Sequence, residues 1–127
     1  MLVERLIPGG DGFARLDDGR ALMVRGPLPG DRVRVTQSSE HAGFIRAEAY
    51  EPVQSSDDRR TPPCSVCERC GGCDLMPLVP EAQRRVKLEL FRDALSRVGG
   101  LSAVVEGIRL HQFGPELGYR SDRKSVV

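Results

Sequence analysis

The sequence predicts a mostly β protein, in which a small five-stranded barrel is followed by a cysteine-rich loop and one amphipathic helix. Three observations support this. Residues 1–53 hold five strand-like runs separated by turn signals, residues 64–73 hold all four cysteines, and residues 80–100 carry apolar side chains at helical spacing. The 14 glycines and 9 prolines favour short strands and many turns over long helices.

The five predicted strands are short apolar runs, and turn residues separate them. The runs read LVERLI, GFARL, RALMV, DRVRVTQ and AGFIRAEAY. The Asp-Gly pair at 18–19 is a strong hairpin signal, and the Pro-Gly pair at 29–30 is typical of a type II turn. The fourth run alternates strictly, with Val33 and Val35 on one face. Because closing the sheet removes its edges, we expect an antiparallel barrel over residues 1–53.

Beyond the barrel, residues 54–63 read as a polar linker that ends in two prolines, and residues 64–78 form a cysteine-rich segment. A helix is predicted over residues 79–100. Pro80 fits its first position, Glu81 suits the positive end of the helix dipole, and two glycines end it. The apolar stripe that we expect to face the core consists of Leu88, Phe91, Leu95 and Val98.

The charge balance does not identify a partner. The chain has 127 residues, 19 basic and 18 acidic, and a net charge of +1. Only Lys87 and Lys124 among the basic residues are lysines. Arginine suits bidentate phosphate contacts and stacking on bases, although a bias in genomic composition explains the same excess more simply. No apolar run is long enough to span a membrane and no signal peptide is visible, so we expect a cytoplasmic protein.

The four cysteines, Cys64, Cys67, Cys70 and Cys73, stand three residues apart. Two disulfides are disfavoured, because nothing indicates secretion and cytosolic thiols stay reduced. Thiolates suit zinc or iron–sulfur clusters, and the glycines at 71–72 allow a tight turn around sulfur. Zinc sites commonly use two ligand pairs separated by a longer loop, and bacterial ferredoxins place their last cysteine further on, before a proline. The spacing alone therefore leaves both metals open.

Three features together resemble the RNA uracil-C5 methyltransferase family. They are the pattern Cys64, five residues, Cys70-Gly-Gly-Cys73, the helix that follows, and Gly-Tyr-Arg at 118–120. The opening GGDGFARLDDGRALMVRGPLPGDRVRV is similar to a TRAM domain, a small OB-like barrel thought to grip RNA. Members methylate carbon 5 of uridine in transfer or ribosomal RNA with S-adenosylmethionine. The resemblance covers nearly all of this chain but only the front part of a family member.

The resemblance implies that Cys64, Cys70 and Cys73 are ligands of a 4Fe-4S iron–sulfur cluster, with a fourth ligand far downstream. It gives Cys67 no role, and zinc remains the alternative metal. It also implies RNA contacts from the barrel. The arginines that we single out for RNA contacts are Arg20, Arg25, Arg34 and Arg46. The candidate platforms for base stacking are Phe13 and Phe44.

We therefore expect the N-terminal RNA-recognition and iron–sulfur portion of a methyltransferase that acts on rRNA or tRNA, monomeric and away from membranes. The catalytic residues and the S-adenosylmethionine site would lie in a missing domain. The alternative is a stand-alone TRAM-type RNA-binding module with a four-cysteine zinc or iron–sulfur site. We expect residues 101–121 to begin a truncated central domain. Residues 122–127 resemble a translated sequencing adapter, and we hypothesise that they are not native.

Overall fold

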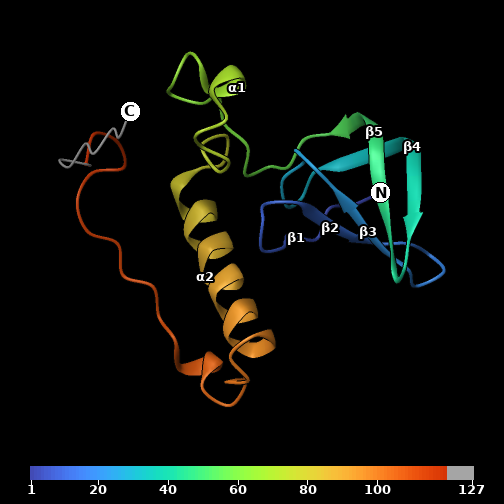
Figure 1. Cartoon of the computed structure of the whole chain (residues 1–127). Coiled ribbons are helices and arrows are strands. Elements are labelled where there is room, and N and C mark those ends of the chain that lie inside the picture. The colour runs from blue at the N-terminus through green and yellow to red at the C-terminus, as the bar shows by residue number, and fades with distance from the viewer. Residues whose placement is uncertain (120–127) are drawn as a thin grey trace, which may run out of the picture.

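The computed structural model describes residues 1–119 and places a five-stranded sheet beside one long helix (Figure 1). The strands are β1 (Arg5–Leu6), β2 (Gly12–Arg15), β3 (Ala21–Val24), β4 (Arg32–His41) and β5 (Phe44–Gln54). The helices are α1 (Cys67–Cys70), α2 (Pro80–Arg97) and the 3-10 turn η1 (Val105–Gly107). The predicted mostly β class is confirmed. No helix within residues 1–119 is long and apolar enough to cross a membrane.

The sheet is mixed rather than wholly antiparallel, with the strand order β1-β2-β3-β5-β4 and a parallel β3–β5 pair. The β4–β5 hairpin lays its second strand against β3, so β3 and β5 run in the same direction. The chain start meets β4 through a bridge between Leu2 and Arg32, and Val3 N donates to Asp31 O at 2.8 Å. The sheet is therefore barrel-like, open along most of β4 and joined at one end, and the expectation of a wholly antiparallel barrel is wrong.

The turn before β4 is the predicted type II turn. Asp31 N donates to Leu28 O at 3.0 Å, and Gly30, the third residue of the turn, has a φ of 89°. A Cβ atom on Gly30 would stand 2.5 Å from Ser56 Oγ. Glycine is therefore required twice at this position, for the backbone angle and for the close approach of the linker.

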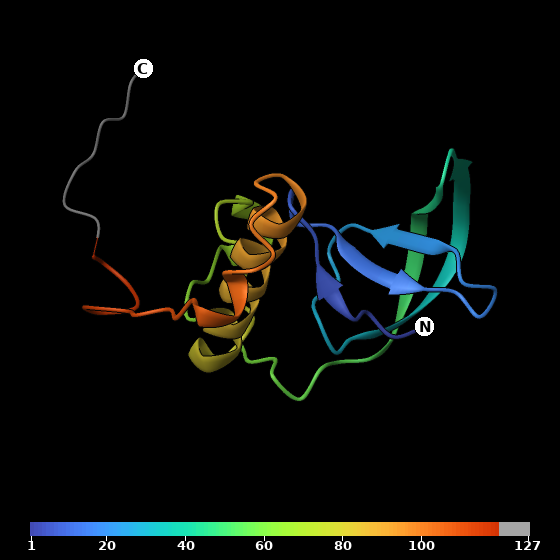
Figure 2. The same ribbon diagram turned by 90° about the horizontal axis from the view of Figure 1, so that it is seen from below.

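Two apolar clusters hold the fold together, one inside the barrel and one between the barrel and α2. The barrel cluster consists of Val3, Ala14, Leu22, Val24, Val33 and Ile45. The second cluster consists of Leu6, Leu28, Leu78, Ala82 and Val86. Both views place the barrel on one side of α2 and residues 108–119 on the other (Figure 1, Figure 2). The second cluster is therefore the apolar joint between sheet and helix.

The predicted apolar stripe of α2 does not face the barrel. Phe91 is 54% exposed and Val98 is 89% exposed, whereas Ala82 and Val86 are buried. The barrel contacts the first half of the helix, where the side chains at four-residue steps from Leu78 onward lie on its inner face. The stripe was placed wrongly because alanine contributes little to an apolar pattern, yet its small side chain lets the helix approach the barrel.

A buried carboxylate, that of Asp31, ties the barrel to the linker. It accepts hydrogen bonds from Leu28 N (2.7 Å), Ser56 N (2.9 Å), Arg59 Nε (2.8 Å) and Arg59 Nη2 (2.6 Å). Burial raises the pKa of Asp31, but the bonds from Arg59 and from the two backbone N–H groups outweigh burial and hold the pKa below its ordinary value. We call this set of contacts the Asp31 clamp.

Removing apolar volume from the joint should destabilise the protein. We expect Leu78→Ala to lower the free energy of unfolding by about 2–5 kcal/mol, because Leu78 is almost fully buried. Val98→Ala is the matched control on the predicted stripe, and we expect a change within about 0.5 kcal/mol. Urea unfolding followed by far-UV circular dichroism measures both. Equal losses in the two variants would contradict this assignment of the buried helix face.

The Asp31 clamp should make stability depend on pH. A carboxylate whose folded pKa is depressed stabilises the fold above its unfolded pKa of about 3.9, and the stabilisation is lost as pH falls through the folded pKa. We expect Asp31→Asn to lower the free energy of unfolding by about 2–3 kcal/mol at pH 7, with a smaller difference below about pH 4. Urea unfolding at pH 7 and pH 3 measures the two differences.

The matched control is Glu51→Gln, because Glu51 forms an exposed pair with Arg34 at 3.3 Å. Exposed pairs of this kind contribute about 0–1 kcal/mol, so the control should stay near wild type at both pH values. A difference between wild type and Asp31→Asn that is as large at pH 3 as at pH 7 would rule out the charge of Asp31 as the stabilising group.

Candidate nucleic-acid interface and cysteine loop

The cysteine-bearing loop begins and ends at one place, next to the start of α2. Arg59 and Leu78 form an isolated antiparallel bridge, and Arg60 N donates to Pro77 O at 2.7 Å. Residues 61–76 therefore leave the body of the protein and return to it through a paired base. Figure 1 shows this loop, with α1 in it, extending beyond the N-terminal end of α2.

All four cysteines lie in this loop as free thiols, Cys64 and Cys67 half-buried and Cys70 and Cys73 exposed. Cys67 begins α1, and Gly71 ends it in the left-handed region with a φ of 68°. The Cys67 Sγ atom lies 3.9 Å from the carbonyl oxygen of Cys73. Partial burial raises the pKa of Cys67, and the charges of the other three thiols raise it further, that of Cys64 most.

The four thiols are neighbours, but their positions do not form a finished metal site. Within residues 1–119, no three Cys, His, Asp or Glu side chains converge closely enough to hold a metal ion. The donor set itself is chemically suited to a soft metal, because it consists of thiols with no disulfide among them. The ligand assignment to Cys64, Cys70 and Cys73 therefore stays a prediction.

The four arginines predicted to contact RNA all lie on the barrel, and each has a carboxylate nearby. The pairs are Arg20–Asp18 (2.8 Å), Arg20–Glu40 (3.0 Å), Arg25–Asp11 (3.9 Å), Arg34–Glu51 (3.3 Å) and Arg46–Asp11 (3.2 Å). Asp11 brings Arg25 and Arg46 together, whereas Arg20 and Arg34 belong to separate pairs. The Arg25 side chain is 83% exposed and has the longest pair distance, so it is the freest of the four to meet a phosphate.

The two candidate aromatic platforms are already engaged. Phe13 is buried, and the guanidinium carbon atoms of Arg5 and Arg15 lie 4.5 Å and 5.5 Å from its ring centroid. Phe44 stacks on His41, with ring centroids 4.8 Å apart and an interplanar angle of 8°. Phe13 is therefore unsuited to stacking on a base, and Phe44 has one face occupied.

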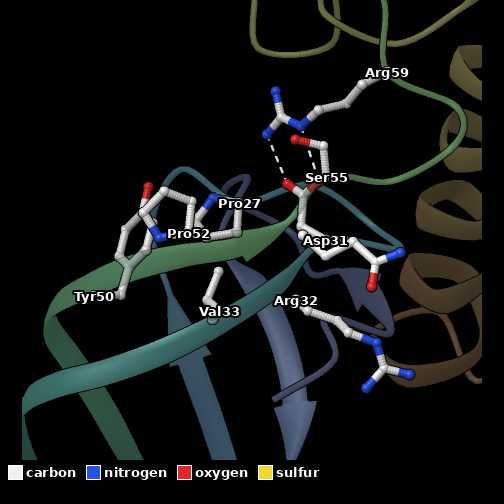
Figure 3. Close-up of a pocket in the computed structure, with 9 residues that line it drawn as sticks. Pro27, Asp31, Arg32, Val33, Tyr50, Pro52, Ser55 and Arg59 are labelled. Carbon is white, nitrogen blue, oxygen red and sulfur yellow. Dashed lines mark hydrogen bonds and ion pairs between the residues drawn. The ribbon is translucent and has the colours of Figure 1, made fainter.

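A surface pocket of about 440 Å³ lies where the start of β4 meets the end of β5 (Figure 3). Tyr50, Pro27 and Pro52 stand together on one side of it, and Asp31 and Arg59 stand on the other. Its lining consists of Pro27, Asp31, Arg32, Val33, Tyr50, Pro52, Gln54, Ser55 and Arg59. We call it the Tyr50 pocket.

Sequence patterns do not single out the Tyr50 pocket. The register of the β4–β5 ladder shifts at three places, between Arg32 and Val33, between Val35 and Gln37, and after Gln37. These bulges place Tyr50 opposite Val35 in the ladder. A strand read as a plain alternation does not show this pairing, and the exposed aromatic residue late in the predicted strand is the one signal that points to it.

Comparison with known proteins agrees with the barrel and extends past it. The family model for the TRAM domain matches residues 1–49. An uncharacterized RNA methyltransferase of Streptomyces avermitilis is 45% identical over 98 residues, which cover 74% of this chain and 23% of that protein. The 23S rRNA (uracil(1939)-C(5))-methyltransferase RlmD of Acidithiobacillus ferrooxidans is 39% identical over 127 residues, which cover 100% of this chain and 28% of that protein.

A solved structure is also similar, that of the tRNA (uracil-54, C5)-methyltransferase of Pyrococcus abyssi with S-adenosyl-L-homocysteine. It has a TM-score of 0.45 and 28% identity, and the match covers 78% of this chain and 21% of that one. The chain thus spans about a quarter of the length of the curated relatives that it matches. Residues 1–49 match the TRAM domain, and the homologues of this chain include RNA (uracil-C5) methyltransferases.

Proposed function

We propose that this chain is the RNA-recognition and cysteine-loop portion of a cytoplasmic, S-adenosylmethionine-dependent RNA (uracil-C5) methyltransferase of rRNA or tRNA. The observation that carries the proposal is the alignment with the Acidithiobacillus RlmD protein along all 127 residues. That similarity spans the barrel, the cysteine loop and α2, so it supports more than a TRAM domain alone. We assign catalysis and S-adenosylmethionine binding to sequence outside this chain.

In this proposal the barrel binds the RNA backbone through Arg20, Arg25, Arg34 and Arg46. The pair of Arg34 with Glu51 is on the surface, and such pairs contribute about 0–1 kcal/mol, so a phosphate can replace that carboxylate at little cost. The pair of Arg20 with Glu40 is also on the surface, whereas Asp11, which pairs with Arg25 and Arg46, has a side chain that is only 13% exposed. Arginine also offers a phosphate two parallel N–H donors. The same interaction makes the affinity depend on salt, because each neutralised phosphate releases counterions.

In the cysteine loop, Cys64, Cys70 and Cys73 are the residues that would hold an iron–sulfur cluster of the 4Fe-4S type. The free thiols and the paired base of the loop support this assignment. A bound cluster would order the loop and thereby position RNA, and it would make no bond in methyl transfer. Zinc held by all four cysteines is the alternative, and the presence of all four free thiols in one loop supports it.

RNA binding should be measurable and salt-dependent. We expect a labelled single-stranded RNA to bind with a log K that falls linearly with log salt concentration, which fluorescence anisotropy measures. Replacing both Arg25 and Arg46 by alanine should weaken binding. It should also reduce the slope by about 0.7 for each RNA phosphate that the variant no longer neutralises.

The matched control is Arg97→Ala, because Arg97 is an exposed, ion-paired arginine on α2 and is not one of the four arginines proposed to bind RNA. Its slope should equal that of wild type. Binding that does not change with salt, or no binding at all, would contradict the proposed role of the barrel.

Metal binding should separate the two cysteine hypotheses. After anaerobic reconstitution with iron, sulfide and a small thiol that can take the fourth position, we expect brown protein containing iron and sulfide. Cys70→Ser should lose most of that iron, whereas Cys67→Ser should retain it. Elemental analysis and the visible absorbance spectrum measure the outcome. Colourless protein with one zinc, lost equally in both variants, would instead support the four-cysteine site.

A further inference from the structure

We propose that the Tyr50 pocket holds one nucleobase of single-stranded RNA, with the Tyr50 ring stacked on the base and Arg32 facing the neighbouring phosphate. The inference rests on the proposed RNA-binding function and adds the residue that recognises a base. It goes beyond backbone contacts, because it requires an unpaired base to turn into the barrel at the end of β4 and β5.

Tyr50 has an aromatic ring that is free to stack. It is 37% exposed, and within residues 1–119 it makes no aromatic stack and no cation–π contact. The rings of Phe13 and Phe44 are covered by arginines or by His41. Stacking of a base on an aromatic side chain contributes about 1–3 kcal/mol and does not require a particular base.

The Tyr50 side chain packs beside backbone and prolines without any ligand. Gly26 has a φ of 108°, and a Cβ atom there would stand 2.8 Å from the Tyr50 hydroxyl oxygen. The hydroxyl end of the phenol therefore lies close to the bare backbone of Gly26, where any larger residue would displace it. Pro27 and Pro52 line the pocket beside it (Figure 3). A rigid apolar wall of this kind lowers the entropy lost when a flat ligand binds.

The charged residues in the lining of the pocket also suit an RNA ligand. Arg32 is exposed and, within residues 1–119, makes no ion pair, unlike Arg20, Arg25, Arg34 and Arg46. It is therefore available to a phosphate without losing a carboxylate partner. The one carboxylate in the lining, that of Asp31, is already matched by Arg59 and by two backbone N–H groups. The pocket thus has a free positive charge at its margin, directed away from Tyr50 (Figure 3), and no free negative charge in its lining.

The lining of the pocket has side chains that can form hydrogen bonds with the edge of a base. The Gln54 side chain has both a donor and an acceptor, and Gln54 lies across the ladder from Arg32. Arg59 uses Nε and Nη2 on Asp31, and its Nη1 has no hydrogen-bond partner among residues 1–119. The volume of about 440 Å³ is within the range of small-ligand sites.

Tyrosine fluorescence can report on the Tyr50 pocket, because the chain has two tyrosines and no tryptophan. Tyr119→Phe leaves Tyr50 as the only tyrosine. We expect an oligouridine of about ten nucleotides, a length within the usual site sizes for single strands, to quench the fluorescence of this variant. The midpoint should match that from anisotropy. An abasic strand of equal length should bind through its phosphates without quenching.

Substitutions of Tyr50 and Arg32 test the pocket independently of the quenching experiment. Tyr50→Leu should weaken binding to the oligouridine roughly tenfold, and Tyr50→Phe should restore it, because phenylalanine keeps the stacking ring. Arg32→Ala should reduce the salt slope by about 0.7, with Arg97→Ala as the unchanged control. Far-UV circular dichroism checks that each variant folds, and the quenching experiment needs no change at Tyr50.

The outcomes distinguish the pocket from the general function. Salt-dependent RNA binding without Tyr50 quenching, or with Tyr50→Leu equal to wild type, would overturn the pocket and leave the barrel as a backbone binder. Quenching by free uridine monophosphate at the same concentration as the oligouridine would overturn RNA as the ligand. If no RNA binds to the wild-type chain, the proposed function and the pocket both fail.

Discussion

The fold depends on the Asp31 clamp, in which one buried carboxylate joins two segments of the chain. The type II turn at residues 28–31 presents the carboxylate, and the linker supplies Ser56 N and Arg59 as donors. Buried charges require partners of this kind, because an unpaired one is costly to desolvate. Arg59 then pairs with Leu78 across the base of the cysteine loop. The position of α2 against the barrel thus follows from a turn that the sequence shows plainly.

Local signals predicted much of the fold. The Asp-Gly and Pro-Gly pairs marked real turns, and the predicted helix differs by only a few residues from Pro80–Arg97. The parallel β3–β5 pair could not be read in the same way, because strand direction depends on which arm of the β4–β5 hairpin meets β3. The inner face of α2 was missed for a related reason. It depends on Leu6 and Leu28, which are far away in the sequence.

The residues of the candidate site could be predicted only where they are close together in the sequence. The spacing of Cys64, Cys67, Cys70 and Cys73 predicted a shared loop, and the structure places all four in one. The presence of arginine alone said nothing about ion pairs, most of which join residues that are far apart in the sequence. The role of Tyr50 could not be predicted from the sequence, because its position opposite Val35 results from bulges between two long strands. Long-range pairing, rather than residue type, decides which side chains surround that pocket.

The arginines around the barrel differ in how strongly they are bound to carboxylates, and this difference decides which of them can bind a phosphate. Exposed pairs such as Arg34–Glu51 contribute about 0–1 kcal/mol, so RNA phosphates can exchange with such carboxylates. Arg59 differs, because its charged hydrogen bonds to a buried carboxylate contribute about 1.5–3 kcal/mol each. The backbone of Arg59 also bridges to Leu78 at the base of the cysteine loop. RNA that displaced Arg59 would open the clamp. Arg59 should therefore keep Asp31 and offer only Nη1, while Arg32, which has no carboxylate to release, meets the phosphate.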